Sequence, residues 1–151
     1  MKRVVVTRSA EDVDRLAERR TAGGYLPGRL PLLASPAIRN VPAIDDVPLA
    51  TTVVIYTSVN AVRHGFDLIA NEVTRDGLVT IAVGAKTRDA LKKKAVHAES
   101  PAREDSEGIL ALLATLPLSP THVILVKGEG GRDLIETSLG GLGIPLSIVE
   151  C

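Results

Sequence analysis

The chain has 151 residues, of which 45% are hydrophobic and 2% aromatic, and its 18 basic and 18 acidic residues leave a formal net charge of zero. This balance, together with the absence of Trp, argues against a strongly basic nucleic-acid binder or a base-stacking platform. The single cysteine, Cys151, excludes an internal disulfide, and no apolar run approaches the roughly 18 residues of a membrane span, so we expect a cytoplasmic protein without membrane or nucleic-acid partners.

The N-terminal residues predict a strand, a helix and a second short strand. The segment Lys2–Thr7 contains a continuous valine run, which favours a strand. Ser9 then has the side chain of a helix N-cap, and the pair Gly23-Gly24 marks the end of that helix. A short strand is predicted near Leu30–Leu33.

Residues 25–50 differ from the rest because they hold five of the nine prolines: Pro27, Pro31, Pro36, Pro42 and Pro48. Proline at this density excludes a helix and permits only short or edge strands. A connector of this length inside one compact domain is unusual. We therefore predict a domain boundary here, with residues 34–50 as an inter-domain connector and residues 1–33 before it.

From residue 51 onward, short apolar strands alternate with amphipathic helices. The predicted strands are Thr52–Tyr56, Val79–Val83, Val96–Glu99, His122–Val126 and Pro145–Val149. The predicted helices run from Val59 to Val73, from Lys86 to Lys94, from Asp105 or Ser106 to Leu116, and from Arg132 to Leu142. This alternation predicts a doubly wound, parallel five-stranded sheet with helices on both faces. Right-handed crossovers restrict it to a flavodoxin-like or Rossmann-like winding, so residues 51–151 are predicted to form a complete α/β domain.

Four turns follow the predicted strands and share one rim of such a sheet, where ligands of open parallel sheets bind. They are Thr57–Asn60, Gly84–Thr87, Pro101–Ser106 and Lys127–Arg132. Each opens a helix, whose free N–H groups and partial positive charge favour an anion. Each also has a simpler explanation as a helix cap or, in KGEGGRD, as a tight glycine turn. These glycines match neither a Walker A loop nor the full G-x-G-x-x-G spacing.

Other catalytic constellations are absent from the sequence. His64, His97 and His122 are scattered, and no pair of them has metal-ligand spacing with a carboxylate. No nucleophile and no general acid-base pair stands out. The basic run Lys92–Lys94, next to Arg88, is interpreted as the solvated end of a helix, where cations favour the negative end of the dipole.

Five stretches of the chain resemble the uroporphyrinogen-III synthase family of tetrapyrrole biosynthesis. They are VVVTRSAEDVDRLAERR, IYTSVNAVRHGF, IAVGAKTRDALKK, EDSEGILALL and ILVKGEGGRDLI, and together they cover essentially the whole chain. The most specific parts are Thr57-Ser58-x-Asn60-Ala61-Val62 and Gly128-x-Gly130-Gly131-Arg132-Asp133. Each motif is short and would match many unrelated sequences by itself. The resemblance is specific because the motifs occur together and in the same order along the chain.

The resemblance implies two α/β domains joined by a two-stranded connector, with the chain starting in one domain, completing the other and then returning. Residues 1–33 would be the strand-helix-strand of a partial first domain. The implied reaction closes the linear tetrapyrrole hydroxymethylbilane to uroporphyrinogen III with inversion of the last pyrrole ring, without a cofactor or metal. The many carboxylates of this substrate suit a rim of helix N-termini, and catalysis would come from positioning and water exclusion.

The same match implies substrate-binding roles for residues of the rim turns and of the first domain, and it implies no proton transfer by any of them. These residues are Thr7, Arg8, Thr57, Ser58, Asn60, Ser106, Gly128, Gly130, Gly131 and Arg132. Thr7 and Arg8 would face the cleft from the first domain. The catalytic residues stay unassigned.

The chain also departs from the family pattern. It stops at Cys151, where the family begins its return crossing, so most of the first domain is missing, including a tyrosine that the family often places near the cleft. The opening TRS has serine where proline is common. We therefore expect the chain alone to be catalytically poor and to self-associate through its incomplete first domain. The alternative is a non-catalytic anion- or tetrapyrrole-binding α/β module, whereas a receiver-like domain lacks the Asp it needs at a strand end.

Overall fold

The computed structural model of the chain describes residues 3–6, 26–29, 48–70, 77–128, 130 and 133–151. The chain forms two compact units, Met1–Pro36 and Ala37–Cys151. We describe each unit by itself.

The first unit contains a parallel pair of short strands. The strand β1 (Arg3–Val6) pairs with β2 (Leu26–Arg29), with Arg3 opposite Leu26. The strand predicted at Lys2–Thr7 is thereby confirmed as β1. The predicted helix after Ser9 and the predicted strand at Leu30–Leu33 lie outside the described residues.

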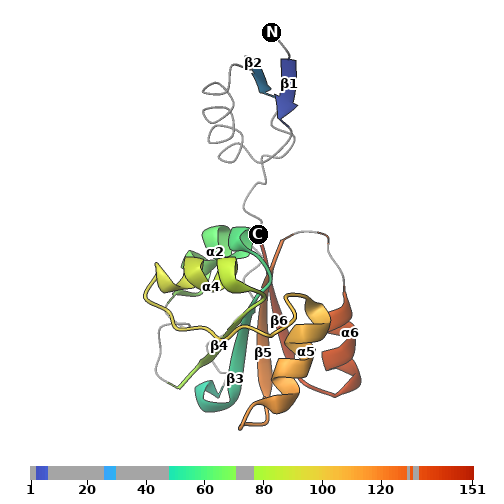
Figure 1. The fold of residues 1–151 in the computed structure, drawn as a ribbon. Coiled ribbons are helices and arrows are strands. Elements are labelled where there is room, and N and C mark those ends of the chain that lie inside the picture. The colour runs from blue at the N-terminus through green and yellow to red at the C-terminus, as the bar shows by residue number, and fades with distance from the viewer. Residues whose placement is uncertain (1–2, 7–25, 30–47, 71–76, 129, 131–132) are drawn as a thin grey trace. The chain divides into compact units, whose positions relative to one another are not determined.

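Among the described residues of the second unit, four parallel strands form one sheet (Figure 1). They are β3 (Thr52–Tyr56), β4 (Val79–Ala82), β5 (His122–Lys127) and β6 (Leu146–Glu150), in the spatial order β4-β3-β5-β6. All five residues of β3 are buried, and so are the last five of β5. Continuous runs of β-branched and aliphatic residues form such strands because both faces of the sheet are covered.

Helices cover both faces of this sheet, as Figure 1 shows. The helices α2 (Val59–Gly65) and α4 (Ala85–Lys92) lie on one face, and α5 (Ser106–Thr115) and α6 (Leu134–Gly141) lie on the other. Side chains of β3 alternate accordingly, since Val54 and Tyr56 belong to the first apolar cluster and Val53 and Ile55 to the second. Two short 3-10 helices, Leu49–Thr51 and Phe66–Leu68, precede β3 and extend α2.

The predicted fifth strand, Val96–Glu99, is wrong as a strand. A single parallel bridge joins Glu99 to Ile81 of β4, with the hydrogen bonds Ala82 N–H to Glu99 O at 2.8 Å and Glu99 N–H to Thr80 O at 2.9 Å. The next ladder donor would be the N–H group of residue 101, which proline lacks. On the other side, the N–H group of Val96 bonds back to Leu91 O at 3.1 Å and closes the end of α4. The segment therefore runs beside β4 without forming a ladder.

This bridge also identifies the winding. Because the 96–99 segment lies outside β4, the order across the sheet is 96–99, β4, β3, β5, β6. This order follows the Rossmann-like pattern rather than the flavodoxin-like one. No helix in the described part of the chain is long and apolar enough to span a bilayer.

Candidate functional site

The carboxyl ends of β3 and β5 lie side by side where the winding of the sheet reverses. Tyr56 is opposite Val126 in the register, so Thr57 and Lys127 leave the sheet as neighbours. The chain after β3 continues through α2 to β4, whereas the chain after β5 continues through α6, on the other face, to β6 (Figure 1). In open parallel sheets this divergence creates the crevice at which ligands bind.

A pocket of about 310 Å³ occupies this crevice. It is lined by the turns after β3 and β5 and by the first residues of α5 and α6: Thr57, Ser58, Ser106, Leu125, Lys127, Gly128, Gly130, Ile135 and Glu136. Five residues that the sequence predicted to bind substrate therefore meet in one pocket, namely Thr57, Ser58, Ser106, Gly128 and Gly130. We call it the switch-point pocket.

The remaining predicted residues are not part of the described lining. Asn60 is exposed on α2, where its side-chain oxygen accepts a hydrogen bond from Arg63 Nη1 at 3.4 Å. Thr7, Arg8, Gly131 and Arg132 lie outside the described residues.

Thr57 and Ser58 are fixed by hydrogen bonds at the start of α2. The backbone N–H group of Thr57 donates to Val126 O at 3.1 Å, and its hydroxyl donates to the same oxygen at 3.3 Å. Ser58 is the N-cap of α2, and its Oγ accepts a hydrogen bond from the N–H group of Ala61 at 2.9 Å. Both hydroxyl groups are thus held at the edge of the pocket, with lone pairs and N–H groups of the helix start around them. Gly130, across the pocket, has φ +66°, a left-handed conformation that favours glycine.

The helix starts at α4 and α5 are already occupied by carboxylates of the chain itself. The N–H group of Ala85 donates to Glu104 Oε1 at 2.9 Å, and the N–H group of Gly108 donates to Asp105 Oδ1 at 2.8 Å. Thr87, which the sequence suggested as a cap of α4, is instead buried inside the helix, and Gly84 is the N-cap. The helix N-termini at these two turns therefore donate to the chain's own carboxylates, unlike the free N-termini that the sequence predicted along the rim. The switch-point pocket is the better candidate site.

Lys127 and Glu136 form an ion pair in the switch-point pocket that the sequence did not reveal. The Lys127 side chain is 9% exposed and that of Glu136 is 16% exposed. Asp133, at the N-cap of α6, lies 3.5 Å from the same ammonium group, but its side chain is 80% exposed. The second carboxylate oxygen of Glu136 is buried without a hydrogen-bond partner.

These contacts keep Lys127 charged. The hydrogen bond that Lys127 donates to Glu136 raises the pKa of the Lys127 amine, against the opposing effect of burial, and the Asp133 carboxylate adds to the increase. The only sequence signal for this cation was a lysine ending an apolar strand immediately before a glycine turn. Strand-end position, rather than any motif, was the feature that pointed to it.

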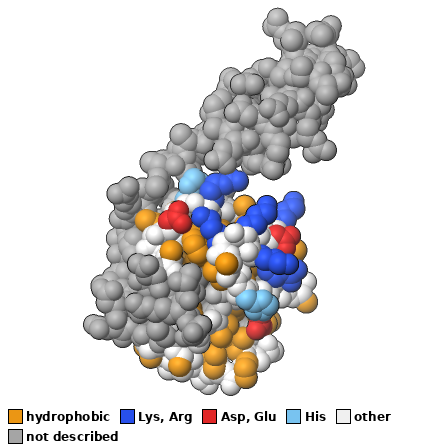
Figure 2. Space-filling model, turned by 90° about the vertical axis from the view of Figure 1, so that its left-hand side faces the viewer, with side chains coloured by type: hydrophobic (Ala, Val, Ile, Leu, Met, Phe, Trp, Pro, Cys, Tyr) orange, Lys and Arg blue, Asp and Glu red, His pale blue; other side chains and the backbone are white. Residues whose placement is uncertain are grey.

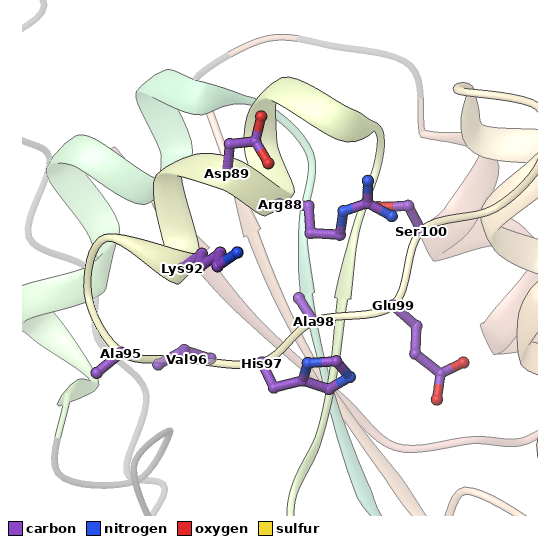
Figure 3. Close-up of a pocket in the computed structure, with 9 residues that line it drawn as sticks. All are labelled: Arg88, Asp89, Lys92, Ala95, Val96, His97, Ala98, Glu99 and Ser100. Atoms are coloured by element: carbon purple, nitrogen blue, oxygen red, sulfur yellow. The ribbon is translucent and has the colours of Figure 1, made fainter.

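A larger hollow of about 720 Å³ lies elsewhere, between α4 and residues 95–100. Figure 3 shows Arg88 and Lys92 extending from α4 toward this segment, whereas Asp89 and Glu99 point away from the space between them. The exposed cations of α4 and of the turn after it, namely Lys86, Arg88, Lys92, Lys93 and Lys94, agree with the predicted solvated helix end. Figure 2 shows basic side chains gathered on this face. Because these cations are solvated and the hollow lies beside the sheet edge, we do not regard it as the functional site.

Within the described residues, no group of three or more His, Cys, Asp and Glu side chains is arranged to hold a metal ion. What the switch-point pocket offers is one buried cation paired with the Glu136 carboxylate, two held hydroxyl groups and a glycine turn. This set can bind an anionic or hydrogen-bonding ligand.

Comparisons with known proteins agree with this fold. The sequence profile of a family described as uroporphyrinogen-III synthase HemD matches residues 14–151. The structure is similar to that of uroporphyrinogen III synthase from the extremely thermophilic bacterium Thermus thermophilus, with a TM-score of 0.54 and 21% identity over 97% of this chain and 60% of that chain. A selenomethionine derivative of a mutant of that enzyme gives a TM-score of 0.52 at 20% identity, over 98% of this chain and 60% of that chain. The chain thus spans about 60% of the length of these relatives.

Proposed function

The chain belongs to the uroporphyrinogen-III synthase family, and we propose that its switch-point pocket binds hydroxymethylbilane during closure to uroporphyrinogen III. The observation that carries this proposal is the meeting of Thr57, Ser58, Gly128 and Gly130 with a buried ammonium group in one pocket at the reversal of the winding. A family match over most of the chain supplies the reaction class, and the pocket supplies a place for an acidic ligand.

In this proposal the residues of the pocket bind and orient the substrate, and none of them transfers a proton. Ring closure removes hydroxide from the terminal hydroxymethyl carbon and joins that carbon to the last pyrrole ring at the α-carbon that already carries the chain. Inversion then breaks the older bond at that carbon and re-forms it at the free α-carbon of the same ring, whose released proton makes up water with the hydroxide. Holding the two ends of a flexible chain near each other reduces the entropic part of the barrier. Keeping water away from the cationic carbon prevents its capture by solvent. Backbone N–H groups, the Ser58 hydroxyl, which only accepts in its cap bond, and Lys127 are suited to donating to carboxylates in such an arrangement.

The test is a coupled assay with freshly prepared hydroxymethylbilane, after which the type I and type III products are oxidised and separated. The proposal predicts type III product above the spontaneous type I background, at a low rate for this chain alone. Gly128→Leu is the informative variant, because a Cβ there meets only Cys151 O at 3.8 Å, so the chain should fold while the larger side chain obstructs the pocket. Gly140→Leu is the matched control, since a Cβ there has nothing within 4 Å and Gly140 is not part of the pocket lining.

Each outcome of this assay separates the two candidate functions. Type III product that is lost in Gly128→Leu and kept in Gly140→Leu supports the synthase proposal. Type I product alone, with the bilane still bound, overturns catalysis by this chain and supports the binding-module alternative. A chain that neither binds the bilane nor changes the product ratio contradicts both.

A further inference from the structure

We propose that Lys127 receives a carboxylate of the ligand in the switch-point pocket, that the exposed Asp133 competes with this carboxylate for the ammonium group, and that Glu136 holds the ammonium group in position. This inference rests on the proposed function, because it takes the ligand to be a polycarboxylate. It adds a binding residue and an internal competitor for the ligand to the site.

The first observation is that the Lys127–Glu136 pair is poorly explained by stability alone. Removing two charges from water is repaid only when the geometry is good and the remaining hydrogen-bonding capacity is satisfied. Here one oxygen of Glu136 is buried without a partner, although the Lys127 side chain is only 9% exposed. Buried polar atoms are nearly always paired in folded proteins, so an unpaired one in a pocket indicates a role beyond packing.

The second observation is that the two carboxylates differ sharply. Glu136 is 16% exposed and in close contact with the ammonium group, whereas Asp133 is 80% exposed and lies 3.5 Å away. An exposed ion pair at this distance contributes little free energy, so Asp133 is readily exchanged for another carboxylate. Glu136 cannot be exchanged in this way without exposing the pair. The ammonium group, which has three donors, thus has one permanent partner and one replaceable partner.

The third observation is where the ammonium group lies. Lys127 is the one basic side chain among the described residues that line the switch-point pocket, and Thr57, Ser58 and Gly128 surround the same space. A ligand carboxylate that binds Lys127 from within the pocket would lie among these hydroxyl and backbone groups. The pocket is therefore selective for an acidic group at one defined position.

The test is an equilibrium titration of the full chain with uroporphyrin III, the oxidised form of the proposed product, followed by its absorbance. Lys127→Gln is expected to weaken binding about tenfold or more, because it removes a charge-assisted hydrogen bond. Lys127→Arg should restore most of the affinity, since it keeps the charge. Asp133→Asn should tighten binding about two- to fivefold, because it removes the competing carboxylate. Lys92→Gln, which removes an exposed cation of α4, is the matched control and should bind like the unmodified chain.

If Lys127 only stabilises the fold and does not bind the ligand, the variants give different results. In that case Lys127→Gln lowers the unfolding temperature while the folded fraction binds the porphyrin normally, and Asp133→Asn has no effect on affinity; this pattern overturns the proposal. If Lys127→Gln does not fold, the comparison of Asp133→Asn and Lys127→Arg with the unmodified chain still decides it. The product assay is read separately. If uroporphyrin binding follows the expected pattern but no type III product forms, this inference stands and the catalytic proposal is overturned. If Lys127→Gln forms type III product with an unchanged KM, the catalytic proposal stands and this inference is overturned.

Discussion

Tyr56 ends β3 with a hydroxyl group that is buried and has no hydrogen-bond partner. The residue belongs to the apolar cluster under α2 and α4, next to Cys151. Burial, with smaller contributions from Cys151 and Asp67, raises the pKa of the phenol, so the hydroxyl stays neutral. An unpaired buried hydroxyl lowers the stability of a fold rather than increasing it.

Tyr56→Phe should therefore be neutral or stabilising, by up to about 1 kcal/mol, because it removes the unpaired group and keeps the ring that fills the core. Urea unfolding followed by circular dichroism measures this change. Tyr56→Leu is the control, since it alters the shape of the core and should destabilise the chain. A loss of more than about 1 kcal/mol in Tyr56→Phe would mean that the hydroxyl has a partner after all.

Contacts between individual residues were predictable from the sequence only where they are local. Ser58 caps α2 through an N–H group three residues along the chain, and its residue type at a strand end was sufficient to predict it. The Lys127–Glu136 pair spans nine positions and depends on where α6 begins. The sequence suggested a start at Arg132, whereas the helix begins at Leu134 with Asp133 as its N-cap.

The start of α5 is the element whose geometry is most sensitive to a single methyl group. Asp105 caps the helix, and Gly108 donates its N–H group to the cap. A Cβ at residue 108 would lie 1.8 Å from the carbonyl oxygen of Arg103, which is backbone and cannot rotate away. The loop that carries Glu104 to the start of α4 is held by the same turn.

Gly108→Ala is expected to destabilise the second unit by about 2 kcal/mol or more, because the backbone of the turn must move. Gly140→Ala, in α6 and with nothing within 4 Å of its Cβ, is the matched control and should stabilise the chain by about 0.5 kcal/mol. Thermal unfolding of both variants compares them directly. Equal effects of the two alanines would show that the turn before α5 accommodates the methyl group.

At the scale of elements, the alternation of strands and helices was readable from the sequence because β-branched runs form strands buried on both sides. The strands β3, β4, β5 and β6 were predicted to within one or two residues. The fifth strand failed because, of the predicted Val96–Glu99 segment, only Glu99 bridges to β4, and the next ladder donor after it would fall on Pro101. A hydrogen bond such as that of Ala85 to Glu104, across 19 residues, depends on the path of a loop that no local pattern encodes.

At the scale of the second unit, the order of the strands decides which turns become neighbours. The sequence allowed both a flavodoxin-like and a Rossmann-like winding. A flavodoxin-like order would have placed the Pro101–Ser106 turn beside Thr57 at the reversal, whereas the observed order places Lys127 and Gly128 there. The rim residues could thus be named from the sequence, but the pocket in which five of them meet could not.

The dependence of stability on pH is a property of the whole unit, because four buried or half-buried groups contribute to it. Burial raises the pKa of Cys151 and of Tyr56, and the hydrogen bond that Lys127 donates to Glu136 raises that of Lys127, so the folded chain keeps these protons when the unfolded chain loses them. Burial lowers the pKa of His122, so below its ordinary value of 6.5 the unfolded chain binds a proton that the folded chain does not. The free energy of unfolding falls as the pH rises where the unfolded chain releases protons that the folded chain keeps, and it falls as the pH drops where the unfolded chain binds protons that the folded chain does not.

The free energy of unfolding should therefore be highest between about pH 6.5 and pH 9, the ordinary values for the His122 and Cys151 side chains. It should decrease above that range as Cys151, then Tyr56 and Lys127, would ionise or lose charge only in the unfolded chain. It should also decrease below that range because of His122. Urea unfolding at a series of pH values measures the profile. Tyr56→Phe and Cys151→Ser should each flatten the alkaline side of the profile without changing its acidic side. His122→Gln should flatten the acidic side without changing the alkaline side. An alkaline side that is unchanged in both Tyr56→Phe and Cys151→Ser would contradict the assignment of these protons to the core beneath α2.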